Sequence, residues 1–205
     1  MRRLLSFHAL LVYLFLYLPI LVVVALSFNE SRRGVHFTGF TLKWYQGLFQ
    51  DPRVLEYFAN TLVVALVSTL VSTVLGTLLA LGLVRYRFPG KGFLRYLLYV
   101  PVVVPDVVMG VSLLLLFAFS RELLGFPRLS LLTVILGHIT FQVAFVTLVV
   151  RSRLLLLDPA LEEAARDLGA RGFQTFLHVT LPLAWPGVAA GALLALTLSL
   201  DDFVV

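Results

Sequence analysis

The sequence predicts an all-α membrane protein, a polytopic helix bundle with about five transmembrane helices. Hydrophobic residues make up 60% of the 205 residues and charged residues 13%, whereas soluble domains have about 45–50% and 25%. The mean hydropathy is +0.99. Apolar residues gather in long runs that are separated by short segments carrying most of the charges. This composition excludes a disordered chain, a nucleic-acid-binding module and an ordinary soluble enzyme.

The apolar runs give the number of helices, because a membrane-spanning helix needs about 20 mostly apolar residues. Five runs meet this condition closely enough: Ala9–Phe28, Thr61–Val84, roughly Tyr96–Ser120, Leu129–Val150 and Leu183–Leu200. The first run follows two arginines, which leaves a signal peptide as an alternative. That run is longer than the apolar core of about 7–15 residues in signal peptides, and no A-x-A cleavage site follows it.

The orientation follows from the distribution of Lys and Arg between the loops. With the N-terminus in the cytoplasm, the cytoplasmic segments hold ten of these residues and the outer segments six. The segment Arg85–Arg95 holds four bases and no acid. Cytoplasmic loops carry the excess of positive charge, so we expect a multi-pass membrane protein with a cytoplasmic N-terminus.

Small residues predict which helices lie inside the bundle. Small side chains four residues apart let helix backbones approach closely in a membrane. Two runs carry such a series: Ser68, Ser72, Gly76 and Ala80 in the second, and Gly187, Gly191, Ala195 and Ser199 in the fifth. Pro101 and Pro105 bracket the start of the third helix, and they predict a break or kink there.

Polar residues inside or beside the runs are candidate functional groups. Asp106 lies in the third run, and an acid at that depth faces a cavity or a partner unless it is at the membrane surface. Asp201 and Asp202 follow the fifth run, where they form either a solvated helix end or a site that attracts cations. His138 and Gln142 share one helix face, which predicts an interhelical hydrogen-bonding pair rather than a metal site.

Residues 151–182 form the one long cytoplasmic loop, and they predict two short helices. Asp158 is a suitable N-cap and Pro159 a suitable first helical residue. Gly169 is a suitable stop for this helix, and a second helix is expected over Gly172–Thr180. The pair projects apolar and charged side chains into the cytoplasm, as a hairpin on the membrane surface or as a docking element for a soluble partner.

The spacing within this loop resembles the EAA loop of ATP-binding-cassette (ABC) importer permeases. The family pattern is E-A-A-x3-G-x9-I-x-L-P, and the matching residues here are Glu163, Ala164, Ala165, Gly169, Val179, Leu181 and Pro182. Valine in place of isoleucine is the one difference. Further segments resemble the second, C-type permease of spermidine/putrescine importers: residues 40–45, 86–91, 105–109, 137–141 and 198–203.

The resemblance implies a type I importer fold in a single permease domain over residues 1–205, located in the bacterial inner membrane. It implies that Glu163, Ala164, Ala165, Gly169, Leu181 and Pro182 couple the loop to a cytoplasmic ATPase dimer. It also implies a second permease subunit and a periplasmic or lipid-anchored substrate-binding protein as partners. The family has six helices, so the sixth is expected to be missing from this chain.

The sequence predicts no catalytic residue, no metal site and no cofactor within the chain. It has no cysteine and no Walker A pattern, so the ATPase must be another chain. Polyamines are polycations, which makes Asp106, Asp201 and Asp202 candidates for a substrate path. The alternatives are another cargo, such as ferric iron, sulfate or an amino acid, a membrane enzyme with metal-binding Asp201 and Asp202, and a passive channel.

Overall fold

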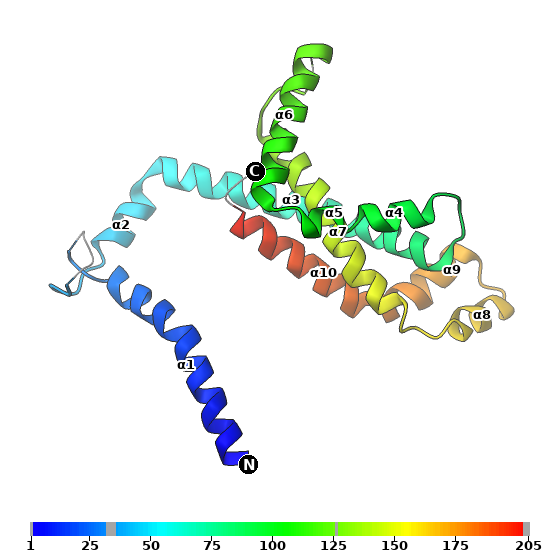
Figure 1. Ribbon diagram of the computed structural model, residues 1–205, viewed down its shortest axis with the longest axis horizontal. Coiled ribbons are helices and arrows are strands. Elements are labelled where there is room, and N and C mark those ends of the chain that lie inside the picture. The colour runs from blue at the N-terminus through cyan, green and yellow to red at the C-terminus, as the bar shows by residue number, and fades with distance from the viewer. Residues whose placement is uncertain (1, 32–35, 126, 203–205) are drawn as a thin grey trace. The chain divides into compact units, whose positions relative to one another are not determined.

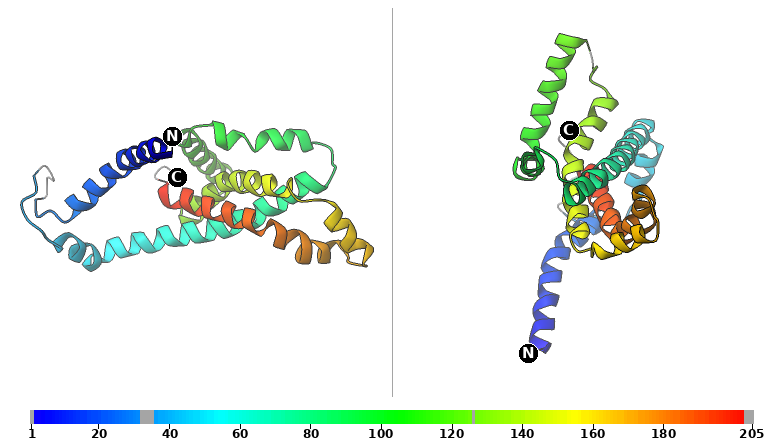
Figure 2. Two further views of the ribbon diagram at one scale, coloured as in Figure 1. Left: turned by 90° about the horizontal axis from the view of Figure 1, so that it is seen from below. Right: turned by 90° about the vertical axis from the view of Figure 1, so that its right-hand side faces the viewer.

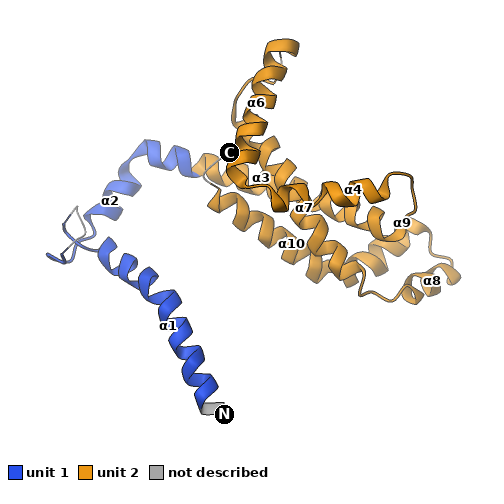
Figure 3. Cartoon of the chain, viewed as in Figure 1, with its two compact units in different colours: residues 1–58 blue, residues 59–205 orange. Residues whose placement is uncertain are grey.

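The computed structural model describes residues 2–31, 36–125 and 127–202, so that Arg32, Arg33 and Phe203 lie outside the described residues. The described part is helical, and its only strand-like contact is an isolated bridge between Asn29 and Phe40. Two compact units make up the chain, residues 1–58 and 59–205 (Figure 3). The helices are named as in Figure 1. The expected single permease domain remains a prediction.

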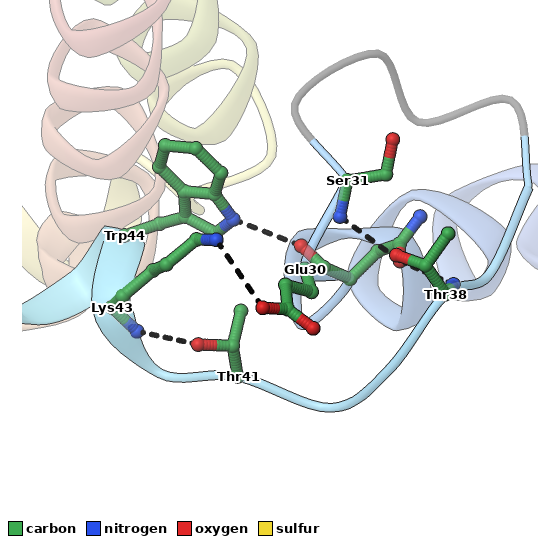
Figure 4. Close-up of polar contacts among 7 residues, drawn as sticks. Glu30, Ser31, Thr38, Thr41, Lys43 and Trp44 are labelled. Atoms are coloured by element: carbon green, nitrogen blue, oxygen red, sulfur yellow. Dashed lines mark hydrogen bonds and ion pairs between the residues drawn. The ribbon is translucent and has the colours of Figure 1, made fainter.

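The first unit contains α1 (Arg2–Ser27), α2 (Lys43–Gln50) and the beginning of α3 (Pro52–Arg85). Between α1 and α2, the described residues 28–31 and 36–42 fold around Asn29, which is almost fully buried. Its Oδ1 accepts hydrogen bonds from Thr38 N (2.9 Å) and Ser31 N (3.3 Å), and its carbonyl oxygen accepts one from Trp44 Nε1 (2.9 Å) (Figure 4). This network ties the loop to the first turn of α2, where Lys43 lies 4.0 Å from Glu30.

The second unit is built on α3, α7 (Leu131–Leu154) and α10 (Leu181–Asp201), which lie side by side (Figures 1 and 2). Their shared core contains Ala80, Val146, Val150, Leu154 and Val188 among its members. Both small-residue series are buried in this bundle, as the sequence predicts. Lipid provides no hydrophobic driving force between helices, so close packing holds them together, and small residues allow the backbones to come close.

The third apolar run is broken, and its long helix begins later than the sequence suggests. Two short helices, α4 (Lys91–Leu97) and α5 (Val100–Val103), precede α6 (Asp106–Leu124). Val104 adopts an extended conformation with ψ 131°, because a residue before proline is driven out of the α region. Pro105 therefore produces the predicted break, and residues 96–105 do not belong to the long helix.

Five of the described helices are long and apolar enough to cross a membrane, by length and composition. Their bounds are Leu4–Ser27, Pro52–Arg85, Asp106–Leu124, Leu131–Leu154 and Gly172–Asp201. The last one is longer than predicted, because α9 (Gly172–Thr175), the π-helical segment η1 (Phe176–Thr180) and α10 follow one another without a gap. The predicted number of spans is confirmed, and the separate helix predicted over Gly172–Thr180 is instead the first part of the last span.

Candidate functional site

The helix α8 (Ala160–Asp167) carries the EAA sequence and begins at a capped turn. Oδ1 of Asp158 accepts a hydrogen bond from Ala160 N at 2.9 Å, so the carboxylate satisfies one of the free donors of the first turn. Glu162 and Glu163 lie in that turn, where negative charge is favourable. The bond expected from Asp158 is present, but the assigned helix begins at Ala160 with Pro159 at its N-cap, one residue later than predicted.

Gly169 ends this helix with a left-handed residue at φ +88°. Gly169 N donates to Arg166 O at 2.9 Å, and Ala170 N donates to Ala165 O at 3.0 Å. These two bonds form a Schellman motif, in which glycine avoids the strain of a positive φ. An added Cβ would meet nothing within 4 Å, so the backbone conformation alone requires glycine here. The predicted helix stop is confirmed.

Apolar side chains of this loop and of the residues that follow it are exposed. Leu168 is 90% exposed and Phe173 is 73% exposed, and Leu161 and Leu177 are exposed as well. An open cavity of about 430 Å³ lies at the turn between α8 and α9, lined by residues that include Ala165, Gly169 and Val179. An exposed apolar surface of this kind marks a protein contact or a membrane contact.

The exposed face also contains most of the predicted coupling residues. Glu163, Ala164 and Gly169 are exposed, and Ala165 is half-buried. Leu181 and Pro182 lie at the start of α10, directly after the π-helical turn. Proline lacks the N–H that an α-helix needs and its ring crowds the preceding turn, and a π-turn changes the hydrogen-bond pattern at that point. The chain can therefore pass through Pro182 without a break.

Glu162, which the sequence analysis did not single out, is the buried acid of this loop. Its Oε1 accepts hydrogen bonds from Arg85 Nε (3.0 Å) and Thr180 Oγ1 (2.9 Å). Arg85 ends α3, so this contact joins the end of the second span to the loop after the fourth. The two segments therefore lie on one side of the membrane, as the predicted alternation of spans requires. The only sequence signal for Glu162 is its spacing of four residues from Arg166.

The three candidate acids of the substrate path lie at the ends of two helices, α6 and α10. Asp106 is the exposed first residue of α6, whose N-terminus favours a negative charge. Asp201 is exposed at the end of α10. The side chain of Asp202 is 16% exposed, and its Oδ2 lies 3.9 Å from His138 Nε2. Since α10 has 21 residues, Asp201 and the coupling loop are separated by about 30 Å of helix.

A polar contact joins the three core helices near Asp202. His138 Nδ1 of α7 lies 2.8 Å from Ser199 Oγ of α10, and Ser199 Oγ lies 3.4 Å from Ser68 Oγ of α3. The interhelical bond predicted for His138 is confirmed. Gln142 is 1% exposed, but its amide atoms have no hydrogen-bond partner among the described residues, so the predicted pair is only half present.

Comparison with known proteins identifies the family. Residues 72–205 match the family of the binding-protein-dependent transport system inner membrane component. The chain belongs to this family. The expected multi-pass protein of the inner membrane is thereby confirmed, and membership implies a substrate-binding protein and an ATPase as partners.

Two relatives from Escherichia coli (strain K12) are similar over most of the chain. The spermidine/putrescine transport system permease protein PotC is 44% identical over 194 residues, which cover 95% of this chain and 72% of PotC. The putrescine transport system permease protein PotI is 41% identical over 198 residues, which cover 96% of this chain and 70% of PotI. Both are named as transport permeases and not as enzymes, in agreement with the expectation of a transport subunit.

The fold also matches solved ABC transporters. A chain of a bacterial ABC transporter involved in the import of the acidic polysaccharide alginate superposes with a TM-score of 0.74 and 19% sequence identity. The match covers 98% of this chain and 74% of that chain. The predicted importer permease fold is therefore confirmed, whereas a likeness at this identity carries no information about cargo.

Proposed function

We propose that this chain is the permease subunit of a polyamine importer that takes up spermidine or putrescine. A partner ATPase hydrolyses ATP, and the permease converts this into alternating access to the two sides of the membrane. The observation that carries the proposal is the exposed apolar face of α8 and its turn, which presents the EAA residues to a partner. The names of the relatives PotC and PotI support the cargo.

Docking uses the small residues of α8 and the turn that follows. Ala164 and Ala165 leave space for a partner surface, and Gly169 holds the turn that presents Leu168. Glu163 meets polar groups of the ATPase from its exposed position in the first turn. Leu181 and Pro182 join this docking face to α10, so a displacement of the loop moves a spanning helix. The loop acts on the bundle as a rigid body.

The assembly contains a second permease subunit, two ATPase subunits and a periplasmic or lipid-anchored substrate-binding protein. The N-terminus is cytoplasmic. The contact between Arg85 and Glu162 supports this topology, because the two segments on that side carry eight Lys and Arg residues: Arg85, Arg87, Lys91, Arg95, Arg151, Arg153, Arg166 and Arg171. Excess positive charge belongs to the cytoplasmic side.

Asp106, Asp201 and Asp202 attract the polycationic cargo. Asp201 and Asp202 follow the end of α10 that lies opposite the coupling loop, whereas Asp106 begins α6 on the side of Arg85 when the spans alternate. Each carboxylate can pair with an ammonium group. Of these three side chains, Asp202 is half-buried and the other two are exposed. Its exchange for asparagine should therefore lower polyamine uptake more than the same exchange at exposed Asp201.

The test is the ATPase activity of the reconstituted complex with its binding protein. Spermidine, putrescine, ferric iron and sulfate are added one at a time, each with a cognate binding protein. The proposal expects stimulation by the polyamines alone. Stimulation by ferric iron or sulfate would support an importer but show that its cargo is not a polyamine. An assembled complex that no solute stimulates, or solute flux without ATP, would overturn the proposal.

A further inference from the structure

Glu162 is shielded from water and its carboxylate is surrounded by donors. The exposed fraction of its side chain is 10%, and that of Arg85 is 19%. Oε1 is 3.0 Å from both Arg85 Nε and Arg85 Nη2, and 2.9 Å from Thr180 Oγ1. Thr180 is itself buried. Burying a charged carboxylate costs free energy unless it is paired with a cation and hydrogen-bonded. Oε1 of Glu162 meets both conditions.

The donors come from two membrane-spanning helices. Arg85 is the last residue of α3, and Thr180 is the last residue of η1, directly before α10. Glu162 lies in the first turn of α8. One side chain of the loop therefore contacts the cytoplasmic end of the second span and the cytoplasmic part of the fifth, and the third and fourth spans separate these two in the sequence.

We propose that Glu162 is the positioning residue of the coupling loop. Glu162, Arg85 and Thr180 form a three-point link, called here the α8 link, that holds α8 against α3 and α10. A displacement of α8 is then passed to both spanning helices together. This inference rests on the proposed function, because the link matters for transport only if α8 receives motion from an ATPase.

The neighbouring charges cannot replace this link. Arg166 Nη2 lies 3.9 Å from Glu162 Oε2, and its side chain is 60% exposed, so its contribution is small. Glu163 is exposed on the docking face. Adjacent residues of a helix point about 100° apart. Glu163 can therefore face the partner while Glu162 faces the bundle of its own chain.

The π-helical segment fits this role. A π-turn holds an extra residue compared with an α-turn, and removing that residue would turn Thr180 by about 100° around the helix axis. The Oγ1 atom would then leave Glu162. The π-turn therefore places Thr180 on the α8 link at the same point where it accommodates Pro182.

The test compares Glu162→Gln, Thr180→Val and Thr180→Ser in the complete reconstituted complex. Uptake per ATP hydrolysed is measured, together with membrane insertion and recovery of the ATPase with the permease. Glu162→Gln keeps the shape and loses the ion pair, and Thr180→Val keeps the shape and loses the donor. Glu122→Gln is the matched control, because Glu122 is an exposed acid at the far end of α6.

We expect Glu162→Gln and Thr180→Val to lower uptake per ATP about tenfold, with the ATPase still recovered. Thr180→Ser and Glu122→Gln should retain wild-type uptake per ATP. Restored uptake in Arg85→Glu/Glu162→Arg, relative to both single variants, would be further support. A structural role alone would lower insertion and leave uptake per ATP unchanged in the inserted fraction.

The outcomes separate this inference from the proposed function. If the wild-type complex shows no cargo-stimulated ATPase activity, the proposed function is wrong and the inference falls with it. If the wild type couples and Glu162→Gln couples equally well, only the inference is overturned. Loss of ATPase recovery in Glu162→Gln would also overturn it, since the residue would then serve docking. If Glu162→Gln does not insert into the membrane, the two Thr180 variants test the inference: lower uptake per ATP in Thr180→Val than in Thr180→Ser supports it, and equal uptake overturns it.

Discussion

Gly76 of α3 lies so close to Val146 of α7 that a Cβ atom on Gly76 would come within 2.7 Å of Val146 Cβ. Gly191 of α10 approaches the same valine, and a Cβ added there would lie 3.3 Å from Val146 Cγ1. Val146 is fully buried. Three spanning helices therefore meet at one side chain, and glycine on two of them makes this approach possible.

This contact predicts that Gly76→Ala destabilises the bundle. The added methyl group must push against Val146 and against the backbone nitrogen of Thr147, which would lie 3.1 Å away. Overpacking of this kind costs about 1–3 kcal/mol. Gly82→Ala on the same helix is the control, because its Cβ would meet nothing within 4 Å. Thermal unfolding in detergent should show a lower midpoint for Gly76→Ala only, and equal midpoints would refute the close packing.

Gly169→Ala should impair coupling through the backbone alone. Residues other than glycine pay about 1–2 kcal/mol for a left-handed conformation, and no side chain obstructs the new methyl group. We expect lower uptake per ATP with normal membrane insertion. Gly172→Ala is the matched control, since Gly172 has open space and no positive φ. The account of the turn would be wrong if both alanine variants behaved alike; Gly169→Pro should be more severe.

Glu163→Lys reverses a charge on the docking face. Glu163 is exposed, so its exchange should leave folding and insertion unchanged. We expect uptake to fall about tenfold because a residue that meets the ATPase is altered. Glu122→Lys makes the same change at the far end of α6. Uptake assays in proteoliposomes that gave equal activity for both variants would remove Glu163 from the docking face.

The hydrogen bond between His138 and Ser199 should couple the stabilities of these positions. Interhelical hydrogen bonds in membranes contribute about 0.6–2 kcal/mol, and the two atoms lie 2.8 Å apart. A double-mutant cycle with His138→Ala and Ser199→Ala should show a non-additive effect of that size. Ser112→Ala is the control, because Ser112 Oγ donates only within its own helix, to Val108 O. Strict additivity of His138→Ala and Ser199→Ala would contradict the bond.

Much of this architecture could be predicted from local sequence signals. Hydropathy gives five spans, Gly169 marks a helix end, Pro105 marks a break, and the series that contains Gly76 marks a buried face. Each of these signals acts through the residue's own backbone or through neighbours on one helix, so no knowledge of the tertiary structure is needed.

The remaining features depend on contacts between distant segments. Glu162 and Glu163 are adjacent acids in the sequence, and the partners that bury Glu162 are Arg85, 77 residues earlier, and Thr180. The π-turn before Pro182 likewise has no distinct composition. The buried side of α8 is formed by Glu162, and Leu168, the residue after this helix, is exposed.

The central claim is that the exposed turn after α8 contacts the ATPase, and one cross-linking measurement tests it most directly. The chain has no cysteine, so Leu168→Cys gives a unique attachment point for a photoactivated cross-linker. Leu200→Cys, exposed at the opposite end of α10, is the control. In the assembled complex the account predicts a cross-link to the ATPase from position 168 and none from position 200. Absence of a cross-link from position 168, or equal yields from both positions, would contradict it.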